Sequence, residues 1–174
     1  MSSEYIAAPL KPERIMQAYP LVQALAPGVT PARWREFAIE VLEDGSAHDT
    51  PRLGRWRIMT LQTAAGYLHA LFIYQLRSDL RDGLCLDVAH MVTFELPGQS
   101  SALQTAIRVI EQIARDCGCR AVTVNVPAAR SNGFTTTASM ADAFGARGYT
   151  ASATAWRKLL AAPVAETPAT LQGR

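Results

Sequence analysis

Residues 84–126 decide the fold of this protein, and they read LCLDVAHMVTFELPGQSSALQTAIRVIEQIARDCGCRAVTVNV. The near-continuous apolar run at 84–94 predicts a strand buried on both faces. Residues 101–115 place apolar side chains at helical spacing, which predicts a helix that ends at Cys117-Gly118. The run AVTVNV at 121–126 is typical of a second buried strand. Together they predict a right-handed strand–helix–strand unit with parallel strands.

Working outward, both flanks of this unit carry further strands. Residues 56–64 and 67–76 are strand-like runs joined by Ala64-Ala65-Gly66, which predicts a hairpin. A turn at 79–83 leads into the strand at 84, so an antiparallel meander precedes the parallel unit. On the other side, residues 137–147 predict a short helix, and residues 149–160 predict a final strand.

The N-terminal part predicts one short strand and two helices. The strand is expected at 4–10. A first helix is expected at 12–26, with Pro20 as a point where it kinks or divides. Thr30-Pro31 is a typical helix start, and an apolar stripe that includes Trp34 runs on to Asp44-Gly45. The complete order β, α, α, β, β, β, α, β, α, β predicts an α/β (α+β) fold, a mixed sheet with helices on its faces.

Length and composition limit the functional classes. The chain has 174 residues and a net charge of +2 with its basic side chains scattered, so we expect a single domain at 1–160 and no nucleic-acid partner. The Ala-Pro-Thr-rich residues 161–174 are expected to form a mobile tail. No apolar run is long enough to span a membrane, and no signal peptide is evident, which predicts a cytoplasmic protein.

The three cysteines predict neither a disulfide framework nor a metal site. Cys117 and Cys119 form a C-x-C pair that matches neither zinc nor thioredoxin spacing, and no histidine lies near them in the sequence. We therefore expect them and Cys85 to be reduced structural thiols, with no bound metal.

Two motifs resemble those of the GNAT acetyltransferases, whose element order this chain shares. The sequence Gln-Ser-Ser-Ala-Leu-Gln at 99–104 follows a strand and opens a helix, like the family's Q/R-x-x-G-x-G/A loop. The sequence AFGARGY at 143–149 resembles the signature before the family's last strand. The resemblance implies a GNAT-like, mostly antiparallel sheet with acetyl-CoA as cosubstrate, whose pyrophosphate binds the helix N-terminus. It assigns the cofactor to Val92, Thr93, Phe94, Gln99, Ser100, Ser101, Ala102, Leu103, Gln104 and Thr137.

The match to the family motifs is incomplete. Gln104 stands where the family has a small residue, and its side chain could crowd a phosphate. Ser101 and Gln104 also have capping-box spacing, so a self-capped helix end is an equal alternative to a phosphate site. Phe144 stands where many members carry a proton-donating tyrosine, so we expect it in the core. Thr137 falls where the family often places an asparagine.

Acetyl transfer needs a neutral amine, and therefore a base or a water chain with a suitable pKa. His90 lies near the family's base position and is the catalytic candidate, with a buried structural histidine as the alternative. Asp87 is expected either to relay protons or to pair with an arginine, and Glu95 is the remaining carboxylate near the loop. The resemblance implies that a backbone N–H within 92–94 polarises the acetyl carbonyl.

Two hypotheses for function follow. The first is an N-acetyltransferase in which a small-molecule or peptide amine attacks acetyl-CoA directly. The second is a GNAT-fold binding or regulatory module without catalysis, suggested by Gln104 and Phe144. The unpaired outer edge of the final strand, together with the family resemblance, predicts a homodimer.

Overall fold

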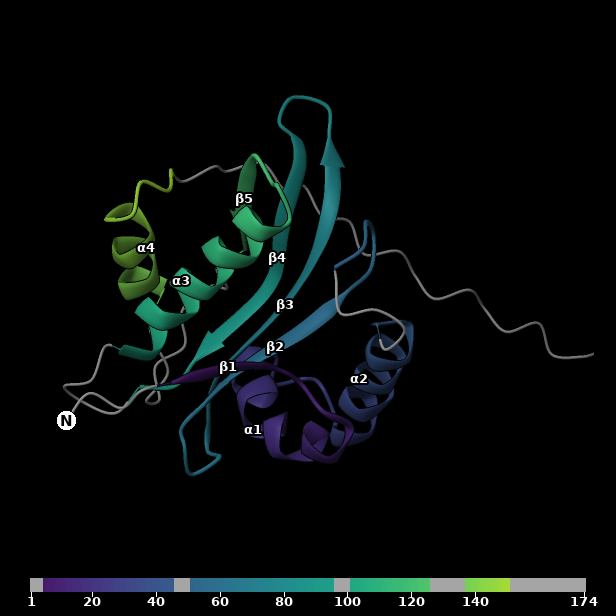
Figure 1. Cartoon of the computed structure of the whole chain (residues 1–174). Coiled ribbons are helices and arrows are strands. Elements are labelled where there is room, and N and C mark those ends of the chain that lie inside the picture. Colours follow the sequence, from purple (N-terminus) through teal and green to yellow (C-terminus); the bar gives the residue numbers. More distant parts are fainter. Residues whose placement is uncertain (1–4, 46–50, 96–100, 126–136, 151–174) are drawn as a thin grey trace, which may run out of the picture.

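The computed structural model describes residues 5–45, 51–95, 101–125 and 137–150, and it places five strands in one mixed sheet (Figure 1). The spatial order is β1-β2-β3-β4-β5, and only β4 and β5 are parallel. The sheet is therefore mostly antiparallel, as predicted. The strands are β1 Ile6–Pro9, β2 Arg57–Gln62, β3 Leu68–Asp79, β4 Gly83–Thr93 and β5 Ala121–Val124.

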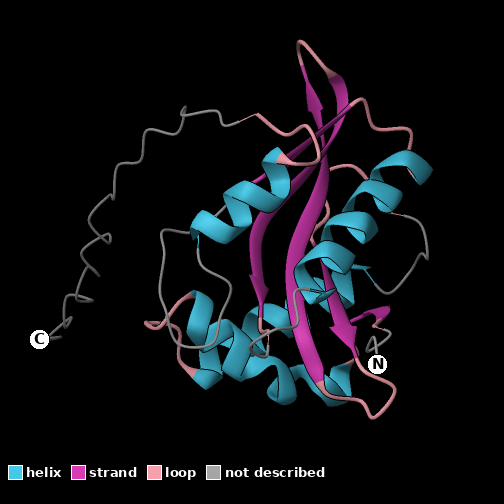
Figure 2. Ribbon diagram, turned by 90° about the vertical axis from the view of Figure 1, so that its left-hand side faces the viewer, coloured by secondary structure: helices cyan, strands magenta, loops and turns pink. Residues whose placement is uncertain are grey.

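Helices cover both faces of the sheet, because side chains alternate between the faces along each strand. One face carries α1 and α2, and the opposite face carries α3 and α4 (Figures 1 and 2). Each pair of helices packs on its own apolar cluster, and the strands separate the two clusters. The helices are the 3-10 turn η1 Pro12–Arg14, α1 Ile15–Leu25, α2 Pro31–Gly45, α3 Ser101–Asp116 and α4 Thr137–Gly145.

The N-terminal helices follow their predicted signals. Pro20 lies inside α1 without dividing it. At the start of α2, the Arg33 N–H donates to the Thr30 hydroxyl oxygen at 3.2 Å, which confirms the predicted cap. Trp34 is 2% exposed, and its indole N–H donates to the Ile15 carbonyl at 2.7 Å. Trp34 is therefore a core residue that ties α2 to α1.

The C-terminal elements require one correction. The predicted helix at 137–147 ends at Gly145, and Gly148 adopts a φ of +84° that only glycine takes up without strain. Tyr149 and Thr150 then lie outside any strand, although the sequence predicted one from 149. The remainder of that predicted strand and the tail at 161–174 lie outside the described residues, so the dimer predicted from the strand stays a prediction.

Within the described part of the chain, no helix is long and apolar enough to cross a membrane. The same residues contain no group of three or more histidines, cysteines and carboxylates placed to hold a metal ion. Cys85, Cys117 and Cys119 are free thiols, and burial raises the pKa of each one. They therefore stay protonated and unreactive at neutral pH.

Candidate active site

The candidate site lies where β4 continues beyond the end of β5. The parallel pairing runs from Cys85 opposite Ala121 to Val88 opposite Val124, and the Asn125 N–H still donates to the Val88 carbonyl at 2.9 Å. β4 then continues to Thr93, and no described residue pairs with it on this side. Among the described residues, β4 thus keeps only its pairing with β3 beyond Val88.

A β-bulge at Ala89 marks the start of this unpaired stretch. Tyr74 pairs with Val88 and its neighbour Ile73 with His90, so Ala89 is an extra residue in β4. Bulges re-aim side chains and are common next to active sites. Here the side-chain alternation shifts by one position.

The shift places the two predicted catalytic residues on one face of the sheet. Val88 and Met91 both pack in the cluster under α3, whereas Val92 packs in the cluster under α1 and α2. Alternation around the bulge therefore puts Asp87 and His90 on the face that α1 and α2 cover. Regular alternation through Ala89, with no bulge, would put these two residues on opposite faces.

The pairing of β4 with β3 shows which backbone N–H groups near the predicted carbonyl-binding segment, 92–94, face away from β3. The Phe94 N–H donates to the His69 carbonyl of β3 at 2.7 Å. In an antiparallel pair every second residue bonds to the partner strand, so Val92 also faces β3. Met91 and Thr93 direct their backbone groups to the other side, beyond the end of β5. The N–H nearest the bulge on that side belongs to Met91, which directly precedes the predicted segment 92–94.

His90 has the properties of a weak base that is neutral at physiological pH. It is exposed, so the alternative of a buried structural histidine is wrong. Protein atoms around the imidazole still remove part of its hydration, and this desolvation lowers the pKa of His90. Asp87 is half-buried and forms no ion pair with any described residue, so the predicted arginine partner is absent there.

The N-terminus of α3 is the predicted pyrophosphate end of the site. The Leu103 N–H donates to a carboxylate oxygen of Glu95 at 2.9 Å. The first turn of α3 holds no acidic residue, so the negative charge at this helix end comes from the end of β4. The Glu95 carboxylate therefore caps this helix end, whereas the Ser101 side chain of the predicted capping box lies outside what the structure describes.

The other predicted cofactor residues divide into three groups. Ala102 and Leu103 lie on the buried side of α3, whereas Gln104 is exposed. Gln99 and Ser100 lie outside the described residues. Thr137 and Ser101 begin α4 and α3, and nothing is described of their side chains.

Phe144 is a core residue, as predicted. It is 5% exposed and packs edge-to-face on Tyr149 with ring centroids 4.9 Å apart. It can therefore donate no proton to a leaving group in this site.

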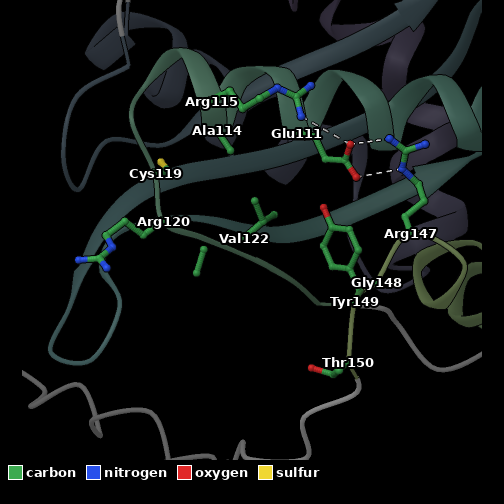
Figure 3. Close-up of a pocket in the computed structure, with 11 residues that line it drawn as sticks. Glu111, Ala114, Arg115, Cys119, Arg120, Val122, Arg147, Gly148, Tyr149 and Thr150 are labelled. Carbon is green, nitrogen blue, oxygen red and sulfur yellow. Dashed lines mark hydrogen bonds and ion pairs between the residues drawn. The ribbon is translucent and has the colours of Figure 1, made fainter.

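Two cavities lie against α3, one lined by helix residues from Thr105 to Arg115 and the other by helix residues from Glu111 to Arg115. The second of these, of about 410 Å³, is lined by residues that include Glu111, Arg120 and Tyr149 (Figure 3). The Tyr149 hydroxyl points toward α3, is buried, and has no hydrogen-bond partner among the described residues. Burial and nearby Glu111 raise the pKa of Tyr149 to about 12. These cavities do not reach the unpaired part of β4, and we assign them no catalytic role.

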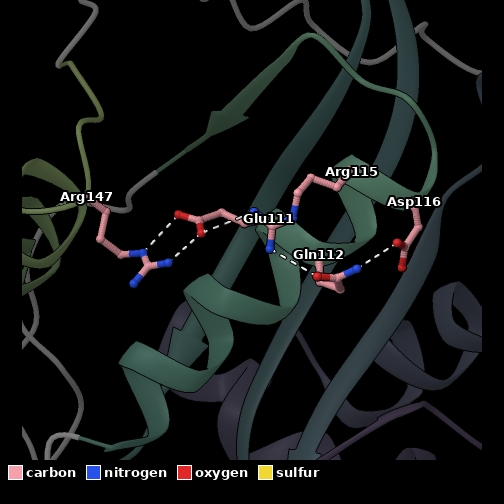
Figure 4. A network of polar contacts seen from close by, with 5 residues as sticks. All are labelled: Glu111, Gln112, Arg115, Asp116 and Arg147. Carbon is pink, nitrogen blue, oxygen red and sulfur yellow. Dashed lines mark hydrogen bonds and ion pairs between the residues drawn. The ribbon is translucent and has the colours of Figure 1, made fainter.

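Glu111, Arg115 and Arg147 line both cavities and belong to one network of polar contacts (Figure 4). Arg147 donates from two nitrogens to the carboxylate of Glu111, at 2.9 Å and 2.5 Å. Arg115 lies 3.8 Å from the same carboxylate and also donates to Gln112. The hydrogen bond from Arg147 lowers the pKa of Glu111. The network ties the end of α4 to α3.

Comparison with solved structures identifies the architecture. The aminoglycoside N-acetyltransferase AAC(6')-Iy, solved in complex with CoA, superposes with a TM-score of 0.64 at 15% identity, covering 91% of this chain and 97% of its own. The chain has the GNAT fold. A GNAT family acetyltransferase from Staphylococcus aureus superposes with a TM-score of 0.63 at 13% identity, covering 92% of this chain and 100% of its own.

A third structure with the GNAT fold is the ribosomal-protein-alanine N-acetyltransferase from Brucella melitensis. Its TM-score is 0.63 at 14% identity, covering 90% of this chain and 100% of its own. No protein-family model and no curated protein matches the sequence. At identities this low the similarity is one of fold, so function must be argued from the site itself.

Proposed function

We propose that this protein is an N-acetyltransferase that moves an acetyl group from acetyl-CoA to an amine. The observation that carries the proposal is the stretch of β4 beyond Val88, where a bulge, an outward-facing backbone N–H and an exposed histidine coincide. An acetyltransferase of the same fold, AAC(6')-Iy, has been solved both with CoA and with a CoA-linked bisubstrate analogue, which supports the choice of donor.

The Met91 N–H is the group that polarises the thioester carbonyl. A backbone donor fixed by the β3 pairing needs no reorganisation as negative charge develops on the carbonyl oxygen. The amine nitrogen then attacks the carbonyl carbon, and the carbon–sulfur bond breaks. The sulfur leaves as a thiolate of roughly cysteine-like pKa, about 8.5, so water suffices to protonate it.

His90 accepts the proton that the amine loses. Its lowered pKa keeps the imidazole neutral, and hence basic, at physiological pH. Asp87 on the same face stabilises the imidazolium that forms. No covalent intermediate on the protein is required.

A second candidate function rests on Glu95. Its carboxylate already holds the Leu103 N–H, a donor that a diphosphate would otherwise receive, and Gln104 replaces a small residue beside it. Both features favour a binding or regulatory module that has lost acetyl transfer. This candidate predicts that acetyl-CoA produces no transfer to any amine.

Calorimetric titration with acetyl-CoA tests the proposal. Saturable binding below millimolar concentration is expected, together with thiol release when an amine is added. The first amines to try are an aminoglycoside and a peptide with N-terminal alanine, the acceptor classes named for proteins of similar fold. Absence of binding at millimolar acetyl-CoA would contradict the proposal.

A further inference from the structure

We infer, on the basis of the proposed function, that Glu95 selects the acyl donor. Its carboxylate disfavours the diphosphate of coenzyme A, so recognition rests on the pantetheine arm along β4. Acyl thioesters of pantetheine, which lack the nucleotide and its diphosphate, are then donors whose binding the Glu95 carboxylate does not weaken.

The first step of the argument is the hydrogen bond between Leu103 and Glu95. The Leu103 N–H has a single proton to donate. The 2.9 Å hydrogen bond directs this proton to the carboxylate of Glu95. The bond is partly buried, so water competes with it less than at a free helix end. A phosphate oxygen must displace the carboxylate to use this donor.

The second step is the charge that Glu95 brings to the helix end. An anion near a helix N-terminus is stabilised by the unpaired N–H groups and the helix dipole. Glu95 already receives this stabilisation, since the first turn of α3 has no acid of its own. A diphosphate at the same place would meet a like charge, or would have to expel Glu95 into water.

The third step is that Glu95 does not influence the part of the site that would hold the acyl group and the pantetheine chain. The outward-facing N–H of Met91 lies on β4 before Glu95, and pantetheine is an uncharged chain of amides. Its binding therefore involves neither the Leu103 N–H nor repulsion from the carboxylate. The preference for donors with or without a diphosphate should depend on Glu95 alone.

The test measures binding of CoA and of pantetheine by calorimetry to three proteins: wild type, Glu95→Gln, and Glu36→Gln. Glu36 is an exposed glutamate on α2 that pairs with Arg33, so its variant makes the same charge change away from the site. Glu95→Gln should bind CoA about three- to tenfold more tightly, the effect expected for removing a competing helix-end charge. Pantetheine affinity should not change, and Glu36→Gln should match wild type for both ligands.

The outcomes separate this inference from the proposed function. If wild type transfers acetyl groups but Glu95→Gln leaves the CoA-to-pantetheine affinity ratio unchanged, the inference is wrong and the function stands. If wild type transfers nothing and the ratio still shifts, the function fails and the role of Glu95 stands. No binding of either ligand to wild type or variant overturns both. Glu95→Ala, which also removes the acceptor oxygen, must shift the ratio in the same direction.

Discussion

The two halves of β4 differ in what surrounds them. Gly83–Val88 pairs with β3 on one side and β5 on the other, and its buried Leu86 and Val88 pack under α3 and α4. The half that begins at the Ala89 bulge keeps only the β3 pairing among the described residues. Both halves bury side chains in the core, and the second half in addition presents His90 and the Met91 N–H on a firmly held backbone.

This difference explains how one strand can serve both stability and chemistry. Catalytic groups need precise placement, and a central strand supplies it better than a loop. The bulge changes the direction of the side chains without ending the β3 pairing. If this account is correct, truncation of the buried Leu86 should lower stability, whereas truncation of the exposed His90 should lower the rate.

The largest effect is expected from His90→Ala. Loss of a general base should lower kcat by about 10²- to 10⁴-fold. The acetyl-CoA affinity and the Tm should stay near wild type, because His90 is exposed and the donor is held by backbone groups. His69→Ala is the matched control, since His69 packs against Tyr5 and Phe94 and should lower the Tm while keeping most of kcat. Wild-type kcat with a reduced Tm in His90→Ala would assign His90 to the fold instead.

In the first half, Leu86→Ala should act on stability. Leu86 is 0% exposed, and truncating a leucine in such a position costs about 2–5 kcal/mol in the free energy of unfolding. Leu80→Ala is the control, because Leu80 in the turn between β3 and β4 is fully exposed and its truncation should change stability little. Denaturant unfolding measures both. Equal stabilities would mean that the first half of β4 is not the core that its burial indicates.

The pH dependence of the rate tests the role assigned to His90 in the second half of β4. Partial desolvation by the surrounding protein atoms lowers the pKa of His90 below its usual value of about 6.5. The basic form therefore predominates at neutral pH, and kcat should fall as the pH drops through that lowered pKa. The acidic limb should be missing from the residual activity of His90→Ala. A wild-type profile that keeps falling from pH 8 to 7 would exclude His90 as the base.

A smaller effect is expected far from the bulge, at the ion pair between Glu111 and Arg147. The lowered pKa of Glu111 means that the folded state prefers its ionised form. Its contribution to stability is then present above the unfolded pKa and lost as the pH falls through the folded one. Glu111→Gln should lower the Tm slightly at pH 7, and the difference from wild type should vanish in acid. Unchanged kcat is expected, and a loss of kcat would show that the far end of α3 influences the site.

The sequence predicts the elements well and the site less well. Hydrophobic period and turn residues locate each described strand and helix, because these signals are local. The bulge at Ala89 arises because β4 has one residue more than the stretch of β3 that it pairs with. The pattern of one strand alone does not show this difference. The bond from Leu103 to Glu95 joins residues on either side of the segment 96–100, so no local spacing in the sequence reveals it.

Acetyl transfer itself tests the central claim most directly. Wild-type protein would be incubated with acetyl-CoA and the amine panel, and each amine followed by mass spectrometry alongside free thiol release. The account predicts at least one amine that gains a single acetyl group in step with released thiol, with His90→Ala slower by about 10²-fold or more. Tight binding of acetyl-CoA without any acetylated amine would contradict the account and favour a binding module.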